Sequence, residues 1–388
     1  MTGIRDRVAV AGVGATAFGE HWDRDQFDLL AEAAHAAVED AGVGLDDVEA
    51  AWVGNYYPFT GIGGTTVSDS LRMYGKPATR VENYCASGLE AFRAACTSVA
   101  AGLYDVVLAC GVEKITDQGA AGLPPMGRAD PVFERPSSPG FFALSATRAF
   151  HEWGWDNRDL ALVAVKNHAN GAVHPKAHFR REITVEEALA APEIASPLRR
   201  YDCAGVSDGA AAVIVTRPEI ARTLRHRNEV VLVKSVQVAA YTASPQFKPS
   251  FEFLGFPSTR EAARRAYAEA GVTDPGGEID VVECHDCFTI TELLNLQDLG
   301  FCAPGDATRL AREGQWHHDG KIPVNPSGGL KAFGHPIGAT GCRMVYEVTS
   351  QLQGRALGRQ VRNPRLGLAH NLGGPGAVSA VAILGRED

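Results

Sequence analysis

Cys85 is the residue of this chain with the clearest chemical potential, because it stands where a strand pattern gives way to a helix pattern. After it, Leu89 and Phe92 begin an apolar repeat at helical spacing. The N–H groups at a helix N-terminus favour negative charge, so this position biases the thiol towards thiolate, the form that attacks acyl carbonyls. The alternative is a small, buried apolar residue, which is what most free cysteines are.

Two later segments are unusually rich in glycine, Asn325–Gly341 and His370–Gly376. Glycine lets the backbone approach a ligand closely and exposes N–H donors that can form an oxyanion hole. His335, held in the first segment, is a candidate general base for a cysteine elsewhere in the sequence. The alternative is that both segments are only tight turns.

A third segment, Glu283–Phe288, carries Cys284, His285 and Cys287 directly after a strand pattern. A cysteine pair at this spacing can belong to a zinc site, but such a site needs a second pair at matching spacing. The chain offers none, so we predict no metal. We expect Cys284 to face the core, on the opposite side of the strand end.

The composition indicates a soluble globular protein. The 388 residues carry a net charge of −9 and 45% hydrophobic residues. They suffice for two domains or for one domain with an internal duplication. The absence of a basic cluster argues against nucleic-acid binding. The sequence has no apolar run long enough for a membrane span and no secretory pattern at its start, and its eight cysteines are scattered. We therefore expect reduced thiols and a cytoplasmic location.

Strand and helix patterns alternate along both halves of the chain. Apolar strands separated by helices predict an α/β fold whose sheet is covered on both faces. The expected strands are Val8–Val13, Ala51–Gly54, Val81 into Cys85, Val106–Cys110, Asp208–Thr216, Val230–Ala239, Ile279–Cys284, Arg365–His370 and Ala377–Leu384. The expected helices are Phe27–Ala41, the segment after Cys85, Phe142–Trp153, Leu160–Ala172, Thr259–Ala270, Ile290–Leu299 and Gly338–Leu352.

Both halves place reactive residues where a strand meets a helix, which suggests a duplicated α/β architecture. The Gly-, Pro- and Ser-rich stretch after Thr116 suggests an inserted functional lobe. We expect a first half formed by residues 1–115 plus 201–225, a loop lobe over 116–200 and a second half over 226–388.

Several motifs resemble those of the thiolase superfamily. Asn83–Gly88 (Asn-Tyr-Cys-Ala-Ser-Gly) looks like the nucleophile segment of thiolases, and Gly334–Gly341 (Gly-His-Pro-Ile-Gly-Ala-Thr-Gly) looks like their catalytic-histidine loop. Ser207–Ala212 resembles a further thiolase segment. The order and spacing agree over essentially the whole chain. The resemblance implies a thiolase-like fold of two duplicated halves in α-β-α-β-α layers, with an inserted loop lobe.

Two departures indicate a subgroup. Most thiolases carry Asn-Glu-Ala-Phe where this chain has His285–Phe288 (His-Asp-Cys-Phe), and Cys-x-Gly where it has Asn371–Gly373. Both forms resemble the sterol-carrier-protein or lipid-transfer type of thiolase. In that subgroup the His-Asp-Cys-Phe segment supplies the second catalytic cysteine, which is Cys287 here.

The resemblance implies the following chemistry. Cys85 attacks the keto carbon of a 3-oxoacyl-CoA while His335 takes the thiol proton. The C–C bond breaks, acetyl-CoA leaves as an enolate, and Cys287 protonates it. A second CoA then removes the acyl group from Cys85. In the reverse Claisen condensation, Cys287 removes the α-proton. Cys287 has an alternative reading as a core cysteine, with another group or water moving this proton.

The same resemblance assigns the oxyanion donors. His285 and His335 polarise the thioester oxygen of the enolate, and the N–H groups of Cys85 and Gly373 hold the other oxyanion. One such donor is worth about 3 kcal/mol. Asn371 is a supporting residue that orients His370 or the loop.

Coenzyme A and acyl-CoA enter as substrates, with no bound cofactor, and the resemblance implies a homodimer or tetramer. We expect the loop lobe to supply the contacts to CoA and to the acyl group. Basic candidates for CoA are Arg128, Lys166, Arg180 and Lys248. Aromatic candidates for the acyl group are Phe141, Phe142, Trp153 and Trp155, whose types core packing explains equally well.

Two other functions stay open. Some lipid-transfer-type relatives are acyltransferases or steroid side-chain aldolases that need an OB-fold partner protein. Those aldolases lack the nucleophilic cysteine, so Cys85 argues against that branch but not against a partner-dependent acyltransferase. The other candidate is a lipid- or acyl-CoA-binding protein with a degenerate site, suggested by Asn371 in place of the usual cysteine. The intact cysteine and histidine set argues against it.

Overall fold

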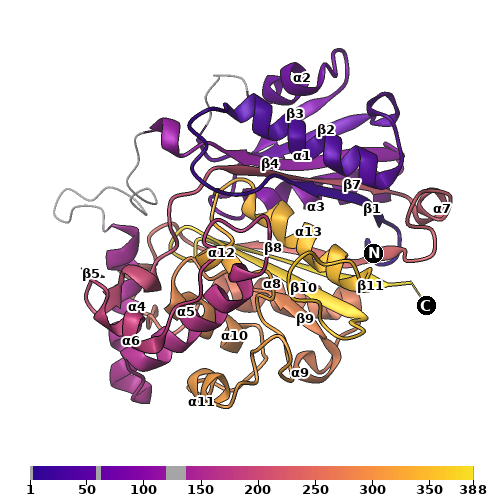
Figure 1. The fold of residues 1–388 in the computed structure, drawn as a ribbon. Helices are drawn as coiled ribbons and strands as arrows, with labels where there is room; N and C mark the ends of the chain where they lie inside the picture. Colours follow the sequence, from indigo (N-terminus) through magenta and orange to yellow (C-terminus); the bar gives the residue numbers. More distant parts are fainter. Residues whose placement is uncertain (1–2, 58–62, 119–136, 388) are drawn as a thin grey trace.

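The structure, a computed structural model, describes residues 3–57, 63–118 and 137–387 (Figure 1). Its strands are β1 (Ala9–Ala15), β2 (Ala50–Gly54), β3 (Ala78–Val81), β4 (Val106–Glu113), β5 (Glu193–Ala195), β6 (Leu198–Arg199), β7 (Gly209–Thr216), β8 (Val231–Ala240), β9 (Val281–Glu283), β10 (Leu366–Gly373) and β11 (Val378–Arg386). Its helices are α1 (Gln26–Ala41), α2 (Thr65–Leu71), α3 (Ser87–Ala100), α4 (Ser138–Trp153), α5 (Asn157–Ala172), α6 (Val185–Ala190), α7 (Pro218–Ala221), α8 (Pro257–Ala270), α9 (Pro275–Glu278), α10 (Thr289–Asp298), α11 (Ala307–Arg312), α12 (Gly329–Ala332) and α13 (Thr340–Leu352).

The main sheet repeats one pairing scheme twice. Its nine strands follow the order β3-β2-β4-β7-β1-β8-β11-β10-β9. In the first half β1 is antiparallel to β7, β7 is antiparallel to β4, and β4 is parallel to β2. In the second half β8, β11, β10 and β9 follow the same scheme. The halves join where Ala9 pairs with Leu232 and Val10 with Val231. The expected duplication is confirmed.

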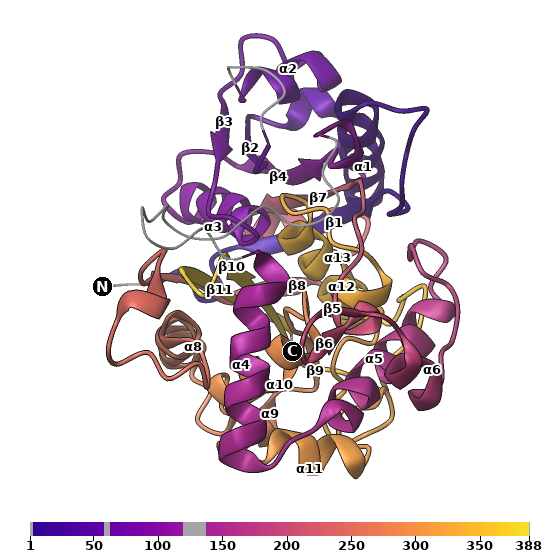
Figure 2. The ribbon, with the colours of Figure 1, turned by 90° about the vertical axis from the view of Figure 1, so that its left-hand side faces the viewer.

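The helices form three layers around the two halves of the sheet (Figures 1 and 2). Successive strand residues face opposite sides. In β4, Val107 packs in the same hydrophobic cluster as Phe92 of α3, whereas Leu108 packs with Leu30 of α1. In the second half, α13 packs on the inner face and α8 on the outer face. The order α1, sheet, α3 with α13, sheet, α8 confirms the expected α-β-α-β-α layering.

The segment between β4 and β7 contains α4, α5, α6 and the β5–β6 hairpin, which lie together beside the second half in Figure 1. Helix α5 contacts α10, α11 and α12, and α4 contacts α10. The division into residues 1–115 plus 201–225, 116–200 and 226–388 stays a prediction. Within the described residues, no helix combines the length and apolarity that crossing a membrane requires.

Helices α3 and α13 meet through glycines at their N-terminal ends. A Cβ on Gly88 would lie 2.7 Å from the carbonyl oxygen of Gly338 and 2.9 Å from the N of Gly341. A Cβ on Gly341 would lie 2.2 Å from the N of Leu89. Real Cβ atoms do not approach backbone so closely, so both positions exclude any side chain. The contact joins the helix after Cys85 to the helix after His335.

We expect Gly341→Ala to lower the free energy of unfolding by about 1–3 kcal/mol, because overpacking forces the two backbones apart. Denaturant unfolding followed by circular dichroism measures the change. Gly19→Ala is the control, because its Cβ would meet no atom closer than 4.0 Å. A Gly341→Ala protein as stable as the unsubstituted one would contradict the backbone contact.

Candidate active site

Cys85 lies in a strained turn between β3 and α3. Tyr84 adopts a φ of 51°, which is uncommon for a residue other than glycine. The Ser87 hydroxyl fixes the turn, since it accepts a hydrogen bond from the N–H of Asn83 (2.9 Å) and donates one to the carbonyl of Tyr84 (2.5 Å). The turn directs the Cys85 side chain towards the second half, where only 7% of it stays exposed.

The charge state of Cys85 differs from the expectation. Burial raises the pKa of its thiol to about 12, and a hydrogen bond from the N–H of Gly374 lowers it only in part. The sequence-based expectation that this helix N-terminus biases the thiol towards thiolate is therefore wrong for the free protein. Desolvation is the largest influence on this thiol, and it favours the neutral form. The thiol needs a base when it reacts.

Two buried imidazoles meet the thiol. The sulfur of Cys85 and one nitrogen each of His285 and His335 all lie within 4.8 Å of one another. The two rings are nearly perpendicular, at 86°, with centroids 5.2 Å apart. Both Nδ1 atoms are engaged elsewhere, whereas both Nε2 atoms are buried without a hydrogen-bond partner. We infer that the Nε2 atoms face the sulfur.

The hydrogen bonds of Thr340 determine the tautomer of His335. The Thr340 hydroxyl donates to the carbonyl of Pro336 at 2.8 Å, so it can only accept from Nδ1 of His335, which lies 2.7 Å away. His335 therefore carries its proton on Nδ1. Its Nε2 is a free lone pair, as a general base requires.

Asn371 gives His285 the opposite tautomer. Its side-chain Nδ2 lies 2.9 Å from Nδ1 of His285, and an amide nitrogen can only donate. His285 therefore accepts at Nδ1 and carries its proton on Nε2, where it is a hydrogen-bond donor. The sequence suggested His370 or the loop as what Asn371 orients. His370 instead lies 3.0 Å from the hydroxyl of Ser379.

Both catalytic-site imidazoles are neutral. Burial lowers the pKa of His335 to about 3 and that of His285 well below its usual value. The buried guanidinium of Arg343 lowers both further. Arg343 forms an ion pair with Glu283 and lies 4.9 Å from the ring centroid of Phe333. The free site therefore holds a thiol, one basic nitrogen and one N–H donor.

Asp286 ties the His285 segment to the His335 loop. Its carboxylate accepts from the N–H of Leu330 (2.6 Å), the N–H of Lys331 (3.2 Å) and Nδ2 of Asn167 (2.7 Å). These bonds fix α12, which leads directly into His335. Sequence reasoning named the segment but gave Asp286 no role.

Glu113, at the end of β4, holds the loop that carries His335 from the side of the first half. It accepts from the N–H of Gly338 (2.9 Å), from the N–H groups of Tyr56 and Tyr57 (2.9 and 2.8 Å), and from Nδ2 of Asn55. Burial raises its pKa to about 7, and the backbone hydrogen bonds oppose that shift. Sequence reasoning missed Glu113, because its partner Gly338 lies 225 residues away.

The two cysteines of the His285 segment face different surroundings. Cys287 packs in the central cluster with Phe142 and Phe288, and its sulfur lies 3.8 Å from the hydroxyl of Thr291. Burial and the neighbouring Cys85 raise the pKa of Cys287 well above its usual value. Cys284 lies in the outer cluster of the second half, 3.9 Å from Nδ1 of His370.

The glycines after Asn371 lie against the nucleophile turn. A Cβ on Gly373 would lie 2.6 Å from the carbonyl oxygen of Asn83, so this position also excludes a side chain. The backbone N–H of Gly374, one residue after the expected donor, lowers the pKa of the Cys85 thiol, and so does the N–H of Cys85 itself. Gly374 has a φ of 59°, in the left-handed region that glycine favours.

The residues expected to contact the substrate differ in their burial. Lys166 is buried, forms an ion pair with Glu292 (2.9 Å) and donates to the carbonyl of Val324 (2.9 Å), which makes it a structural residue. Arg180 and Lys248 are exposed, and Arg128 lies outside the described residues. The aromatic candidates all pack around the central cluster, in which Phe141 and Phe142 are completely buried: Phe141, Phe142, Trp153 and Trp155.

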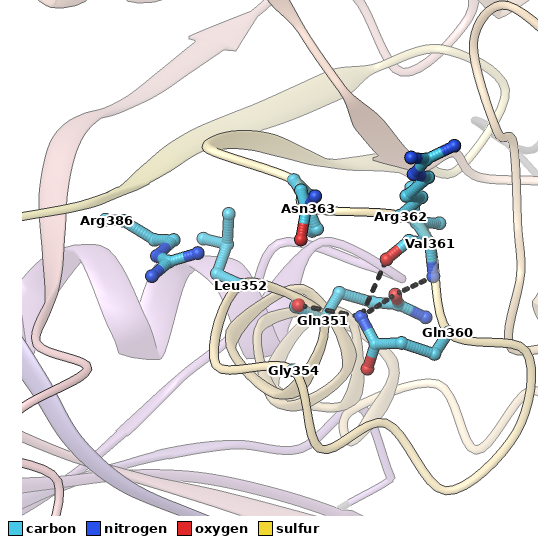
Figure 3. A pocket seen from close by; sticks show the side chains of 9 residues that line it. Gln351, Leu352, Gly354, Gln360, Val361, Arg362, Asn363 and Arg386 are labelled. Atoms are coloured by element: carbon cyan, nitrogen blue, oxygen red, sulfur yellow. Dashed lines mark hydrogen bonds between the residues drawn. The ribbon is translucent and has the colours of Figure 1, made fainter.

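A surface pocket of about 300 Å³ lies at the C-terminal end of α13, the end away from His335 (Figure 3). Its nine lining residues include Gln351, Arg362 and Arg386 but no cysteine or histidine. It contributes nothing to the site around Cys85.

A buried cysteine beside two neutral imidazoles, at the junction of two α/β halves, is the site of a cysteine-dependent acyl-transfer enzyme. Family models agree: "Thiolase, N-terminal domain" matches residues 8–219 and "Thiolase C-terminal domain-like" matches residues 241–386. The chain belongs to the thiolase family.

The chain is similar to several known proteins. It is 40% identical to "Acetyl-CoA acetyltransferase" of Methanothermobacter thermautotrophicus, over 99% of this chain and 100% of the relative. It is 34% identical to human "Sterol carrier protein 2", over 96% of this chain and 71% of the relative. A solved structure described as "Ltp2-ChsH2(DUF35) aldolase" shares 26% identity with a TM-score of 0.84, and the match covers 99% of this chain and 98% of that one.

We expect Thr340→Val to slow alkylation of Cys85 by iodoacetamide at neutral pH by about 10- to 100-fold, because a base that has lost its orientation gives up part of the 10²- to 10⁴-fold that a positioned base contributes. Peptide mass spectrometry against time gives the rate. Thr349→Val is the matched control, because Thr349 is a buried threonine of the same helix whose hydroxyl has no hydrogen-bond partner. Equal rates in both variants would show that Thr340 does not orient the base.

Proposed function

We propose that this protein is an acyl-CoA C-acetyltransferase, a thiolase that cleaves 3-oxoacyl-CoA with CoA or runs the reverse Claisen condensation. The observation that carries the proposal is the convergence of the Cys85 sulfur with His285 and His335 within 4.8 Å. The similarity to an acetyl-CoA acetyltransferase over the full chain supports it. Coenzyme A and its thioesters are substrates, with no bound cofactor.

In the first step Cys85 attacks the keto carbon and Nε2 of His335 takes the thiol proton. A neutral thiol beside a neutral imidazole suits this order, because the charge develops only as the bond forms. We assign the oxyanion to the N–H of Cys85 and to the turn at Gly373 and Gly374. We include Gly374 because its backbone N–H lowers the pKa of the Cys85 thiol in the free protein.

The second step separates the acetyl-CoA enolate from the acyl-enzyme. His285 donates its Nε2–H to the enolate oxygen, and the imidazolium of His335 donates a second hydrogen bond. Cys287 delivers the proton to the enolate carbon. Its burial and high pKa suit a thiol that stays protonated until the enolate forms. The thiol of CoA then attacks the acyl group, and Cys85 leaves. The proton that His335 holds and the proton of the CoA thiol restore the thiols of Cys85 and Cys287 and leave His335 neutral.

A partner-dependent acyltransferase or lyase is the second candidate. It is favoured by the structural neighbour, whose description names an aldolase assembled with a DUF35 protein. We propose a homodimer or tetramer in the cytoplasm as the basal form, with an OB-fold partner as an optional addition. The complete set of cysteines and histidines argues against an acyl-CoA- or lipid-binding protein without catalysis.

Covalent loading tests the proposal. The protein is incubated with acetyl-CoA and with longer acyl-CoAs, and the Cys85 peptide is examined for an acyl adduct. We expect an adduct that added CoA removes, and none in Cys85→Ala. The absence of an adduct with every acyl-CoA, in a folded sample, would contradict covalent acyl transfer and favour the binding protein. Loading without cleavage of 3-oxoacyl-CoA would favour the partner-dependent acyltransferase.

We expect Cys287→Ala to keep acyl loading of Cys85 but to lower the rate of 3-oxoacyl-CoA cleavage by about 10²- to 10⁴-fold, the range for loss of an acid–base group. The two rates are measured by mass spectrometry and by acetyl-CoA release. Cys284→Ala is the matched control, because it removes a buried thiol of the same segment that faces another cluster. Full cleavage activity in Cys287→Ala would show that another group moves the proton.

A further inference from the structure

The site around Cys85 contains buried side-chain atoms that could bind a ligand and that form no hydrogen bond within the protein. Cys85 is 7% exposed, and His285 and His335 are completely buried. Nε2 of each histidine has no hydrogen-bond partner. Buried polar atoms without partners are uncommon and call for a physical explanation. A substrate oxygen explains them during turnover, but the same atoms are also ligands.

We propose that the free enzyme binds one borderline-soft divalent cation, with Zn²⁺ as the best fit, through Sγ of Cys85, Nε2 of His285 and Nε2 of His335. Thiolate sulfur and imidazole nitrogen are the donors that Zn²⁺ prefers, and three protein ligands leave a fourth position for water or chloride. Among the described residues, this is the one group of three such side chains close enough to share an ion.

The geometry is close to that of a tetrahedral zinc site. Zn–S and Zn–N bonds of about 2.3 and 2.0 Å place the ligand atoms about 3.3–3.6 Å apart. The three atoms now lie within 4.8 Å of one another, so each pair has to close by at most about 1.5 Å, given these bond lengths. His335 already presents the required lone pair, because Thr340 accepts the proton on its Nδ1.

His285 needs one rearrangement. It now carries its proton on Nε2, so this proton has to move to Nδ1 for the metal to bind. Oδ1 of Asn371 is buried without a partner, and rotating the amide by half a turn brings it to Nδ1 as an acceptor. The hydrogen bond then orients the ligand from behind, as is usual for metal-bound histidine.

The proton balance of binding is simple. Zn²⁺ displaces the proton of the Cys85 thiol, which goes to solvent, and His285 only exchanges its tautomer. No oxidant or reductant takes part. Because the metal holds the nucleophile and occupies the lone pair of the base, the bound form cannot accept an acyl group. The cation is thus a reversible inhibitor of the site rather than a cofactor, and its binding does not depend on the reaction that the enzyme catalyses.

Titration of the full-length reduced protein with Zn²⁺ against a chromophoric chelator tests the proposal, without any acyl-CoA. We expect one equivalent to bind, and Co²⁺ in its place to give a thiolate charge-transfer band. Cys85→Ser should weaken binding by about 100-fold or more, since loss even of a supporting outer group typically costs 10- to 100-fold. Cys302→Ser, which changes a half-buried cysteine elsewhere, should leave it unchanged.

A second measurement guards against variants that fail to fold. In the unsubstituted protein, Zn²⁺ should slow iodoacetamide alkylation of Cys85, and EDTA should restore it. Equal Zn²⁺ binding in Cys85→Ser and the unsubstituted protein, or no protection of Cys85 at saturating Zn²⁺, would overturn the site. Because neither readout uses acyl-CoA, failure here leaves the acyl-loading result unaffected, and the two proposals fail separately.

Discussion

The backbone contact between α3 and α13 is the constraint on which the site depends. The nucleophile belongs to the first half of the chain and both histidines belong to the second, so they meet only if the two central helices approach closely. Gly88 and Gly341 allow that approach, since a side chain at either position would overlap backbone atoms of the other helix. The same contact brings both helix N-termini to the site, where their N–H groups favour developing negative charge.

Burial determines the chemistry that this contact makes available. It raises the pKa of Cys85 to about 12 and lowers that of His335 to about 3, so neither is charged before substrate binds. Two residues that do not react, Thr340 and Asn371, then determine the tautomers of the two histidines. Thr340 leaves His335 with a lone pair, and Asn371 leaves His285 with an N–H donor. In the usual family pattern a cysteine stands at the position of Asn371, so here that position orients a histidine, and Cys287 is left as the candidate for the second proton.

Local patterns predicted most of the elements, because their signals lie within one segment. Helix α1, for example, runs from Gln26 to Ala41 with Gly42 as its C-cap, close to the expected Phe27–Ala41. Helix α4 begins four residues before the expected Phe142, because Ser137 caps it and Pro139 suits its first turn. The short β5–β6 hairpin and helices α2 and α6 were not expected, since stretches of two to seven residues carry little periodic signal.

The sequence did not predict those parts of the site in which hydrogen bonds join segments that are far apart in the chain. Motifs named Cys85, His285, Cys287 and His335, but the hydrogen bond from Asn371 to His285 spans 86 residues and has no local signature. The same holds for the bond between Glu113 and Gly338. Lys166 illustrates the reverse error, because a basic residue that suited a ligand in the sequence is engaged by a buried Glu292.

The most direct test of this account is the protonation state of the two site histidines. Protein labelled with ¹⁵N-histidine, with His285→Gln and His335→Gln for assignment, reports each ring nitrogen at neutral pH. The account predicts two neutral rings, with the proton on Nδ1 of His335 and on Nε2 of His285. An imidazolium at His335, or a proton on Nδ1 of His285, would contradict the assignment of base and donor.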